Sequence, residues 1–333
     1  MTSVPLPARS QVSEYVRPLN ILRDLPRVAD LIELCFANNM DSEGRSYVRQ
    51  MRRASRDASF MQWASNAIEG ASMPLSGFVW EQDGRIIGNA SLVPFRHKGK
   101  RLYLIANVAT HPEHRRKGIA RTLTERAMQH ARQRGGHELW LHVRADNPGA
   151  VQMYSDLGFV ECARRTTWRM SKDGHIAPPF PDRSDQAFST PIVTKRQSRF
   201  WPQQLTWLKR AHPEELSWYH STNWNRLKPG LLNWLYRVFI EIDVRQWAVQ
   251  KDGRLKGVLI WMPTARNASL WLACEPNADA ESITHLLHTA QRELGHRRDL
   301  TLEHPAGLQE GAIQAAGFHL SRTLIWMYTK GAT

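Results

Sequence analysis

Close cysteine pairs, long apolar runs and an apolar leader are all missing from this sequence of 333 residues. Its three cysteines, Cys35, Cys162 and Cys274, form no close pair, which argues for a reducing compartment and against a metal site of the zinc type. No uninterrupted apolar run approaches the roughly 20 residues of a membrane span, and the first residues, MTSVPLPARSQ, contain no apolar signal region. We therefore expect a cytoplasmic protein with no membrane partner and no metal.

The charge of the chain is strongly positive. Lys and Arg number 45 against 31 Asp and Glu, a formal net charge of +14. A basic surface can attract nucleic acid, anionic lipid or an acidic substrate, and it can equally serve an anionic cofactor, so charge alone decides little. The length favours two domains, and a hydrophobic content of 42% is enough for a full core in each.

The most informative segment runs from residue 104 to 135, LIANVATHPEHRRKGIARTLTERAMQHARQRG. An apolar run at 104–109 predicts a strand, a turn with three consecutive cations follows, and helical spacing of apolar residues begins after Gly118. The first amides of a helix have no internal partner and carry the positive end of its dipole, so this arrangement can bind phosphates. The alternative is an ordinary strand-to-helix turn with solvated arginines.

Two motifs point to one family. Residues 115–120, RRKGIA, resemble the R-x-x-G-x-G/A acetyl-CoA loop of the GNAT N-acetyltransferases, and residues 108–113, VATHPE, resemble the strand exit before that loop. Further on, Asn147, Ala150, Tyr154 and Gly158-Phe159 resemble the signature N-x-x-A-x-x-x-Y-x-x-x-G-F of the same family. The two motifs occur in order and at a suitable separation, which makes the match specific over about residues 13–170.

The resemblance implies an α+β (α/β-like) fold. Its sheet is mixed, mostly antiparallel and twisted, is flanked by helices, and is splayed between the strand at 104–109 and the strand at 139–143. The resemblance also implies acetyl-CoA as co-substrate, held by strand, loop and helix residues: Val108, Ala109, Thr110, Arg115, Arg116, Lys117, Gly118, Ile119, Ala120, Asn147 and Tyr154. Asn147 could alternatively be only a helix cap, and Tyr154 only a core tyrosine.

The mechanism that the resemblance implies is direct attack of a primary amine on the thioester within a ternary complex. Tyr154 is the candidate general acid for the departing thiolate, because a phenol is neutral at pH 7 and can donate a proton. Many members of the family place a glutamate on the strand before the loop, but here Asn107 and two apolar residues stand there, and Asn107 could only orient a water. The base stays open among a chain of waters and three side chains, namely His111, Glu138 and His142.

A second, incomplete copy of the pattern occupies the other half of the chain. Asp83-Gly84-Arg85-x-x-Gly88 recurs as Asp252-Gly253-Arg254-x-x-Gly257, and Gly158-Phe159 recurs as Gly317-Phe318. The turn after residues 270–273, however, reads CEPNADAE and has neither a basic residue nor a glycine. Carboxylates there would cap the helix themselves and repel a pyrophosphate. We predict a catalytic domain at 13–170, a linker at 171–192 and a degenerate GNAT-like domain at 193–333 that does not bind acetyl-CoA in the usual way.

Tryptophan is concentrated in this second half, which holds nine of the 13. Core packing explains that better than an aromatic acceptor pocket, although Trp218, Tyr219, Trp224 and Trp234 are candidates for one. We expect a small-molecule or peptide amine as acceptor, no nucleic acid, and a monomer or homodimer. Two other functions stay open: an aminoacyl-tRNA-dependent or other acyl transferase of related tandem fold, and a non-catalytic acyl-CoA-binding sensor or interaction protein.

Overall fold

The computed structural model describes residues 15–37, 40, 42–54, 76–170, 190–195, 198–219, 224–228, 244–263, 268–295 and 300–331. Trp234 and most of the linker predicted at 171–192 lie outside these residues. The chain forms two compact units. Unit 1 comprises Met1–Val143, Asn147–Glu161 and Trp326–Thr333, and unit 2 comprises Arg144–Asp146 and Cys162–Ile325.

The sheet of unit 1 takes its first five strands in chain order and ends on the last strand of the chain. Hydrogen-bonded neighbours are β1 (Val16–Pro18), β2 (Ser76–Gln82), β3 (Arg85–His97), β4 (Lys100–Thr110), β5 (Glu138–Arg144) and the end of β12 (Phe318–Lys330). All described pairs among β1 to β4 are antiparallel, and the pair of β4 with β5 is parallel. A tight hairpin turn joins β2 to β3, in which Asp83 and Gly84 adopt φ values of 50° and 71°.

The predicted splay is present between β4 and β5. Their parallel register runs from Leu102 opposite Glu138 to Ile105 opposite Leu141, and it stops there. Both strands continue, β4 as far as Thr110 and β5 as far as Arg144. The sheet therefore opens beyond Ile105, and the mixed, mostly antiparallel α+β fold expected from the sequence is confirmed.

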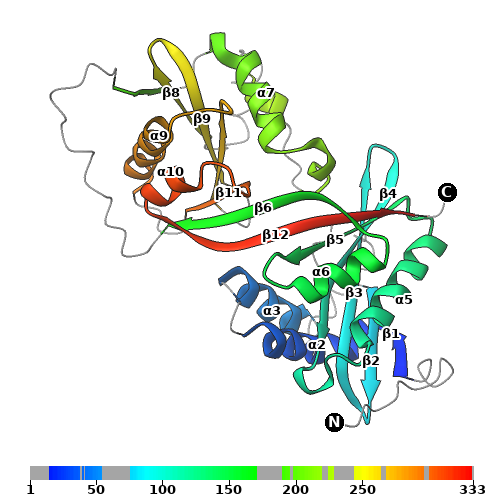
Figure 1. Cartoon of the computed structure of the whole chain (residues 1–333). Coiled ribbons are helices and arrows are strands. Elements are labelled where there is room, and N and C mark those ends of the chain that lie inside the picture. The colour runs from blue at the N-terminus through cyan, green and yellow to red at the C-terminus, as the bar shows by residue number, and fades with distance from the viewer. Residues whose placement is uncertain are drawn as a thin grey trace. The chain divides into compact units, whose positions relative to one another are not determined.

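Helices cover both faces of this sheet (Figure 1). One face carries α2 (Ile21–Phe36) and α3 (Ser42–Ala54), whose apolar side chains share a core with β2, β3 and β4. The other carries α5 (Ile119–Gln133) and α6 (Pro148–Asp156), which are joined by an ion pair of 2.8 Å from Arg121 to Asp156. Gly88 on β3 gives α5 its close approach, because a Cβ there would stand 2.7 Å from Cγ2 of Ile119.

The sequence around Asp24, with Pro26 two residues later, predicts a helix cap at Asp24, and this prediction is wrong. The helix α2 begins earlier, and Asn20 is the cap: its side chain accepts from the Arg23 amide at 3.1 Å. The Asp24 carboxylate is fully buried, accepts from the Asn20 amide at 2.8 Å and pairs with Arg17 at 2.5 Å. Asn and Asp are equally good caps, so the local sequence could not separate the two positions.

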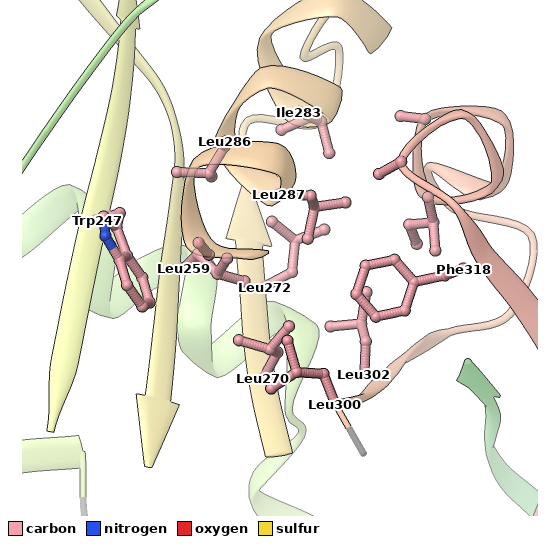
Figure 2. Packing of buried hydrophobic residues seen from close by; sticks show 14 of the residues in the cluster. Trp247, Leu259, Leu270, Leu272, Ile283, Leu286, Leu287, Leu300, Leu302 and Phe318 are labelled. Atoms are coloured by element: carbon pink, nitrogen blue, oxygen red, sulfur yellow. The ribbon is translucent and has the colours of Figure 1, made fainter. Parts of the chain in front are cut away.

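Unit 2 repeats this plan. Its strands, in hydrogen-bonded order, are β6 (Val160–Met170), β11 (Thr301–Pro305), β10 (Ala268–Cys274), β9 (Arg254–Pro263), β8 (Arg245–Lys251) and β7 (Ile192–Lys195). The helices α9 (Ala280–Glu293) and α10 (Glu310–Ala315) pack over the core that Figure 2 shows, which includes Leu270 and Leu272 of β10, Ile283 and Leu287 of α9, and Phe318. A second core, which includes Trp271 and Ala273, carries α7 (Trp201–Ala211).

The splay is repeated as well. The parallel register of β10 with β11 consists of Ser269 opposite Thr301 and Leu270 opposite Leu302. Beyond those two pairs the strands separate, as β4 and β5 do in unit 1. Short 3-10 turns complete the described chain: η2 (Pro112–His114), η3 (Ser198–Phe200), η4 (Glu214–Leu216) and η5 (Trp224–Leu227).

The units do not coincide with the contiguous ranges predicted from the sequence. The strand that ends at Met170 was expected to close the first domain, but β6 pairs with β11 and closes the sheet of unit 2. The end of β12 belongs instead to unit 1, where Tyr328 stacks on Trp140 with ring centroids 5.0 Å apart. Both strands follow the same helix-Gly-Phe pattern, so the local sequence does not say which sheet each one joins. The boundaries 13–170 and 193–333 stay a prediction.

Within the described residues, no helix combines the length and the apolar character that crossing a membrane requires.

Candidate functional site

The turn between β4 and α5 has the backbone geometry of an anion site. Gly118 is the N-cap of α5 with φ 77°, and Arg116 before it also has a positive φ of 64°. Left-handed residues of this kind turn successive amides toward one concave side. No side chain caps the first amides of α5, so they keep their capacity for an anionic ligand.

The cations of the turn divide into two kinds. Nε of Arg115 donates to the Thr110 carbonyl at 3.4 Å and so braces the turn against the strand it leaves. Arg116 and Lys117 are exposed, and neither pairs with a carboxylate within the described part of the chain. Ile119 is buried against β3, so only its backbone is available to a ligand. A diphosphate of an elongated cofactor fits this donor set.

The equivalent turn in unit 2 is closed to such a ligand. Asp279 caps α9, with its side chain accepting from the Ser282 amide and from the Ser282 hydroxyl, both at 2.9 Å. Glu281 adds a second carboxylate in the first turn and pairs with Lys251 at 2.8 Å. The prediction that acids cap this helix themselves is confirmed.

The second motif lies beside the loop, as one shared site requires. Asn147 is the N-cap of α6, and its Oδ1 accepts from the Ala150 amide at 3.2 Å, so the capping alternative is confirmed. Nη1 of Arg116 lies 3.5 Å from the position that a Cβ of Gly149 would occupy. The N-termini of α5 and α6 are therefore adjacent, although about 30 residues separate them.

Tyr154 is buried on α6, with only 6% of its surface exposed. Its ring meets Phe159 edge to face at a centroid distance of 6.1 Å. Burial raises the pKa of the Tyr154 phenol well above its ordinary value, since the charged phenolate would be poorly solvated there. The side chain therefore stays protonated over the whole neutral range and can donate.

The strand β4 carries a β-bulge inside the splay. Its register with β3 shifts between Asn89 and Ser91, and Asn107 adopts a φ of 53°. The Asn107 side-chain amide donates to the Tyr47 hydroxyl at 2.7 Å, while the Asn107 carbonyl accepts from Nδ2 of Asn89 at 2.8 Å. The partners of Asn107 were not predicted from the sequence; the available signal was two polar side chains, Asn89 and Ser91, within the apolar part of the strand at 85–97.

The other strand residues proposed for the cofactor lie just beyond the bulge. Val108 is half-buried, and Ala109 packs in the core that β4 shares with α2 and α3. The Thr110 hydroxyl is buried and has no hydrogen-bond partner among the described residues. An unsatisfied buried hydroxyl at the mouth of the splay is consistent with a ligand there.

The three candidate bases receive little support. Glu138 pairs with Lys100 at 2.8 Å at the paired end of β5; burial raises its pKa, but the bonds from Lys100 and Trp140 outweigh burial and lower it overall. His142 packs against Trp326 with centroids 4.9 Å apart. Nδ1 of His111 is buried with no hydrogen-bond partner among the described residues, and it lies 4.0 Å from a carboxylate oxygen of Glu113.

Three side chains after β4 lie close enough for a metal, although no metal was predicted. Ligand atoms of His111, Glu113 and His114 are within 4.8 Å of one another. Glu113 is 83% exposed, and three cations follow directly in the chain. That charge opposes a divalent ion, so the cluster fits a metal poorly.

The tryptophans of unit 2 serve mainly as core. Trp247 and Trp261 belong to one buried cluster, and Trp201, Trp207 and Trp271 to another. Trp218 is buried as well, and Tyr219 is exposed. A cavity of about 30 Å³ lies between Arg165, His212, Trp224 and Trp271, among others, and has room for a water rather than for an acceptor.

Known proteins resemble the first half in sequence and the whole chain in fold. The model of the acetyltransferase (GNAT) family matches residues 37–159. The [ribosomal protein bS18]-alanine N-acetyltransferase of Escherichia coli K12 is 38% identical over 68 residues, which are 20% of this chain and 46% of that one. The spermidine N(1)-acetyltransferase of Vibrio cholerae is 47% identical over 70 residues, 21% of this chain and 34% of that one. The chain thus spans less than half the length of either relative.

Among solved structures, a GCN5-related N-acetyltransferase from Sphaerobacter thermophilus superposes with a TM-score of 0.52 at 13% identity, covering 95% of this chain and 97% of that chain. At this identity the likeness concerns the fold alone. Residues 37–159, which contain the uncapped helix, the bulged strand and the buried tyrosine, match the GNAT acetyltransferase family.

Proposed function

We propose that unit 1 transfers an acetyl group from acetyl-CoA to a primary amine, and that unit 2 is a degenerate GNAT-like unit that binds no acetyl-CoA. The contrast between two helix N-termini carries the proposal. The N-terminus of α5 has a glycine cap, free amides and exposed cations, whereas Asp279 already satisfies that of α9. Only the first of these can accept a diphosphate.

The chain would bind the cofactor mainly through its backbone. The amides of residues 116–120 would hold the diphosphate. Val108 and Thr110 lie on the part of β4 that does not pair with β5, and their backbone would pair with the extended arm like an added strand. Acetyl-CoA, when bound, supplies a thioester, in which the acyl group is already activated. Fixing the thioester and the amine in one geometry would supply much of the rate.

Tyr154 would complete the proton balance. The neutral amine forms the new bond to the acyl carbon as the carbon–sulfur bond breaks, and Tyr154 donates its proton to the departing sulfur. The amine loses a proton in turn, which water can accept, because no described carboxylate or imidazole is placed clearly for that role. Attack takes place directly in the ternary complex, without an acyl-enzyme.

A primary amine is the acceptor class that the related sequences support. The two relatives described above are named for acetylating an alanine of a ribosomal protein and a polyamine. We propose a small-molecule or peptide amine for this chain.

The test measures acetyl-CoA binding and free-thiol release across a panel of amines, amino acids, aminoglycosides and peptides. The unmodified chain should bind acetyl-CoA and release thiol with at least one amine. Gly118→Glu should abolish binding, since φ 77° disfavours a side chain and the carboxylate repels the diphosphate. Ala280→Glu, an acid added in the first turn of α9, is the matched control and should bind normally.

Three results would overturn the proposal. Unchanged affinity in Gly118→Glu would remove the loop assignment. Tight binding with no thiol release across the panel would favour the sensor. Co-purifying tRNA that modest salt removes would favour the aminoacyl-tRNA-dependent transferase.

A further inference from the structure

The bulge in β4 has no counterpart in unit 2. Gly88 lies opposite Thr110 and Gly257 opposite Cys274, so the two glycines of the internal repeat give matching registers. The register of β10 with β9 is then continuous over all of its pairs. The register of β4 with β3 instead shifts by one residue between the partners of Asn89 and Ser91. No residue of β10 has a positive φ, in contrast to Asn107. The extra residue is specific to the unit with the open helix terminus.

The partner strand differs at the corresponding position. Asn89 lies opposite Ala109, and its counterpart Val258 lies opposite Ala273. Nδ2 of Asn89 donates to the bulge carbonyl of Asn107 at 2.8 Å and to the Ser91 hydroxyl at 3.0 Å. Valine can make neither bond. The buried asparagine and the bulge thus occur together in unit 1, and both are absent from β9 and β10 of unit 2.

Stability alone does not account for this asparagine. Asn89 is fully buried, and its Oδ1 has no hydrogen-bond partner among the described residues. A buried acceptor without a partner destabilises a fold by about 1–3 kcal/mol. Because Asn89 destabilises the fold in this way, its presence is better explained by the backbone that its Nδ2 group holds in place.

What the donor holds is the backbone at the opening of the sheet. Asn107 stands two residues beyond Ile105, the last residue of β4 that pairs with β5. A bulge removes backbone groups from the ladder and re-aims them. In the splay, a freed amide can face the carbonyl oxygen of a bound thioester, where charge develops during attack. The side chain of Asn107, tied to Tyr47 of α3, anchors the same bulge from the other side.

We propose that Asn89 is a positioning residue, which holds the β4 bulge in its catalytic geometry with Tyr47 as a second tether. This inference rests on the proposed acetyl transfer. It assigns Asn89 no contact with the substrate. The residue acts through the backbone of Asn107.

Two isosteric variants test the inference, because Thr and Val have nearly the same shape and only Thr can donate to the Asn107 carbonyl. We expect Asn89→Val to lower kcat about 10- to 100-fold, which is less than the roughly 10²- to 10³-fold cost of removing an oxyanion donor itself, because the bulge is loosened and not deleted. The Kd of acetyl-CoA should change little because the loop is untouched. Asn89→Thr should recover a large part of kcat. Tyr47→Phe, which leaves the backbone tether intact, should cost less than Asn89→Val.

Spectroscopy separates positioning from a merely structural role. The infrared carbonyl band of bound acetyl-CoA, labelled with carbon-13, should move toward its free frequency in Asn89→Val and not in Asn89→Thr. The control Val258→Thr should change neither kcat nor the band. Thermal unfolding shows whether each variant is folded. If Asn89→Val is unfolded, the band is measured in Tyr47→Phe, where we expect a smaller displacement than a folded Asn89→Val would show.

The inference is overturned if folded Asn89→Val keeps full kcat and an unshifted band, or if the Thr and Val variants are equally impaired. A band in Tyr47→Phe identical to that of the unmodified chain would remove Tyr47 as a tether. Failure of the unmodified chain to release thiol with any amine would contradict the proposed function itself, so the two failures can be told apart.

Discussion

A methyl group added at Gly88 should loosen the start of α5 and so weaken the proposed acetyl-CoA site at the N-terminus of that helix. The new Cβ would stand 2.7 Å from Cγ2 of Ile119 and 2.9 Å from Cδ1 of Leu123. Carbon atoms in good contact are about 3.5–4.0 Å apart, so Ile119 must retreat by roughly 1 Å. Ile119 is β-branched and stiff at χ1. The first turn of the helix must therefore move with its side chain.

Overpacking of this kind typically costs about 1–3 kcal/mol, and we expect about 2 kcal/mol for Gly88→Ala. The internal repeat supplies a matched control. A Cβ on Gly257 would stand 2.9 Å from Cδ1 of Ile283, and its next neighbours are at 3.5 Å. That contact is the mobile end of a side chain, which can turn aside. Gly257→Ala should therefore cost less than about 1 kcal/mol.

Denaturant unfolding gives the two stabilities, and calorimetric titration gives the affinities for acetyl-CoA. Gly88→Ala should bind several-fold more weakly, because the amides after Gly118 shift with Ile119. Gly257→Ala should bind as the unmodified chain does. Equal stability and equal affinity of the two variants would refute the packing argument and, with it, the idea that Gly88 sets the position of the anion site.

Two further predictions concern single side chains. Tyr154→Phe should keep acetyl-CoA affinity and lower kcat by on the order of 10²-fold; unchanged turnover would remove Tyr154 as the acid. In the unmodified chain burial raises the Tyr154 pKa, so a steady-state pH profile should show no alkaline loss of kcat below about pH 10. Asp24→Asn should destabilise the fold by about 2 kcal/mol near pH 7, since it breaks the buried pair with the partly solvated Arg17. Burial raises the Asp24 pKa, but hydrogen bonds from Arg17, the Asn20 amide and Arg23 outweigh burial and lower the pKa overall. The stabilisation is therefore fully present when the pH is above the ordinary pKa of an aspartate, and it is lost as the pH falls through the lower pKa of Asp24 in the folded chain. Urea titrations at pH 7 and below about pH 4 should show the difference shrink; a difference independent of pH would contradict this account.

Local signals in the sequence were sufficient for much of the first unit. The hairpin at Asp83-Gly84 and the helix after Gly118 each depend on a backbone conformation that few residues adopt, so their positions could be predicted. The acids around Asp279 likewise predicted a capped helix, because a carboxylate at an N-terminus satisfies the amides that a phosphate would otherwise bind.

Features that depend on strand pairing could not be predicted in the same way. The bulge at Asn107 exists only relative to β3, and its main tether, Asn89, lies on another strand. The exchange of β6 and β12 between the sheets has the same origin. Both strands carry similar patterns, and only long-range pairing, such as that of Arg165 with Pro305, decides which sheet each one joins.

The most direct measurement of the central claim is a calorimetric titration of the full chain with acetyl-CoA. One site per chain is expected, lost in Gly118→Glu and retained in Ala280→Glu, because α5 presents an uncapped, cationic N-terminus whereas Asp279 caps the equivalent helix α9. Two sites per chain, or one site that survives Gly118→Glu, would contradict the assignment of acetyl-CoA binding to the first unit alone.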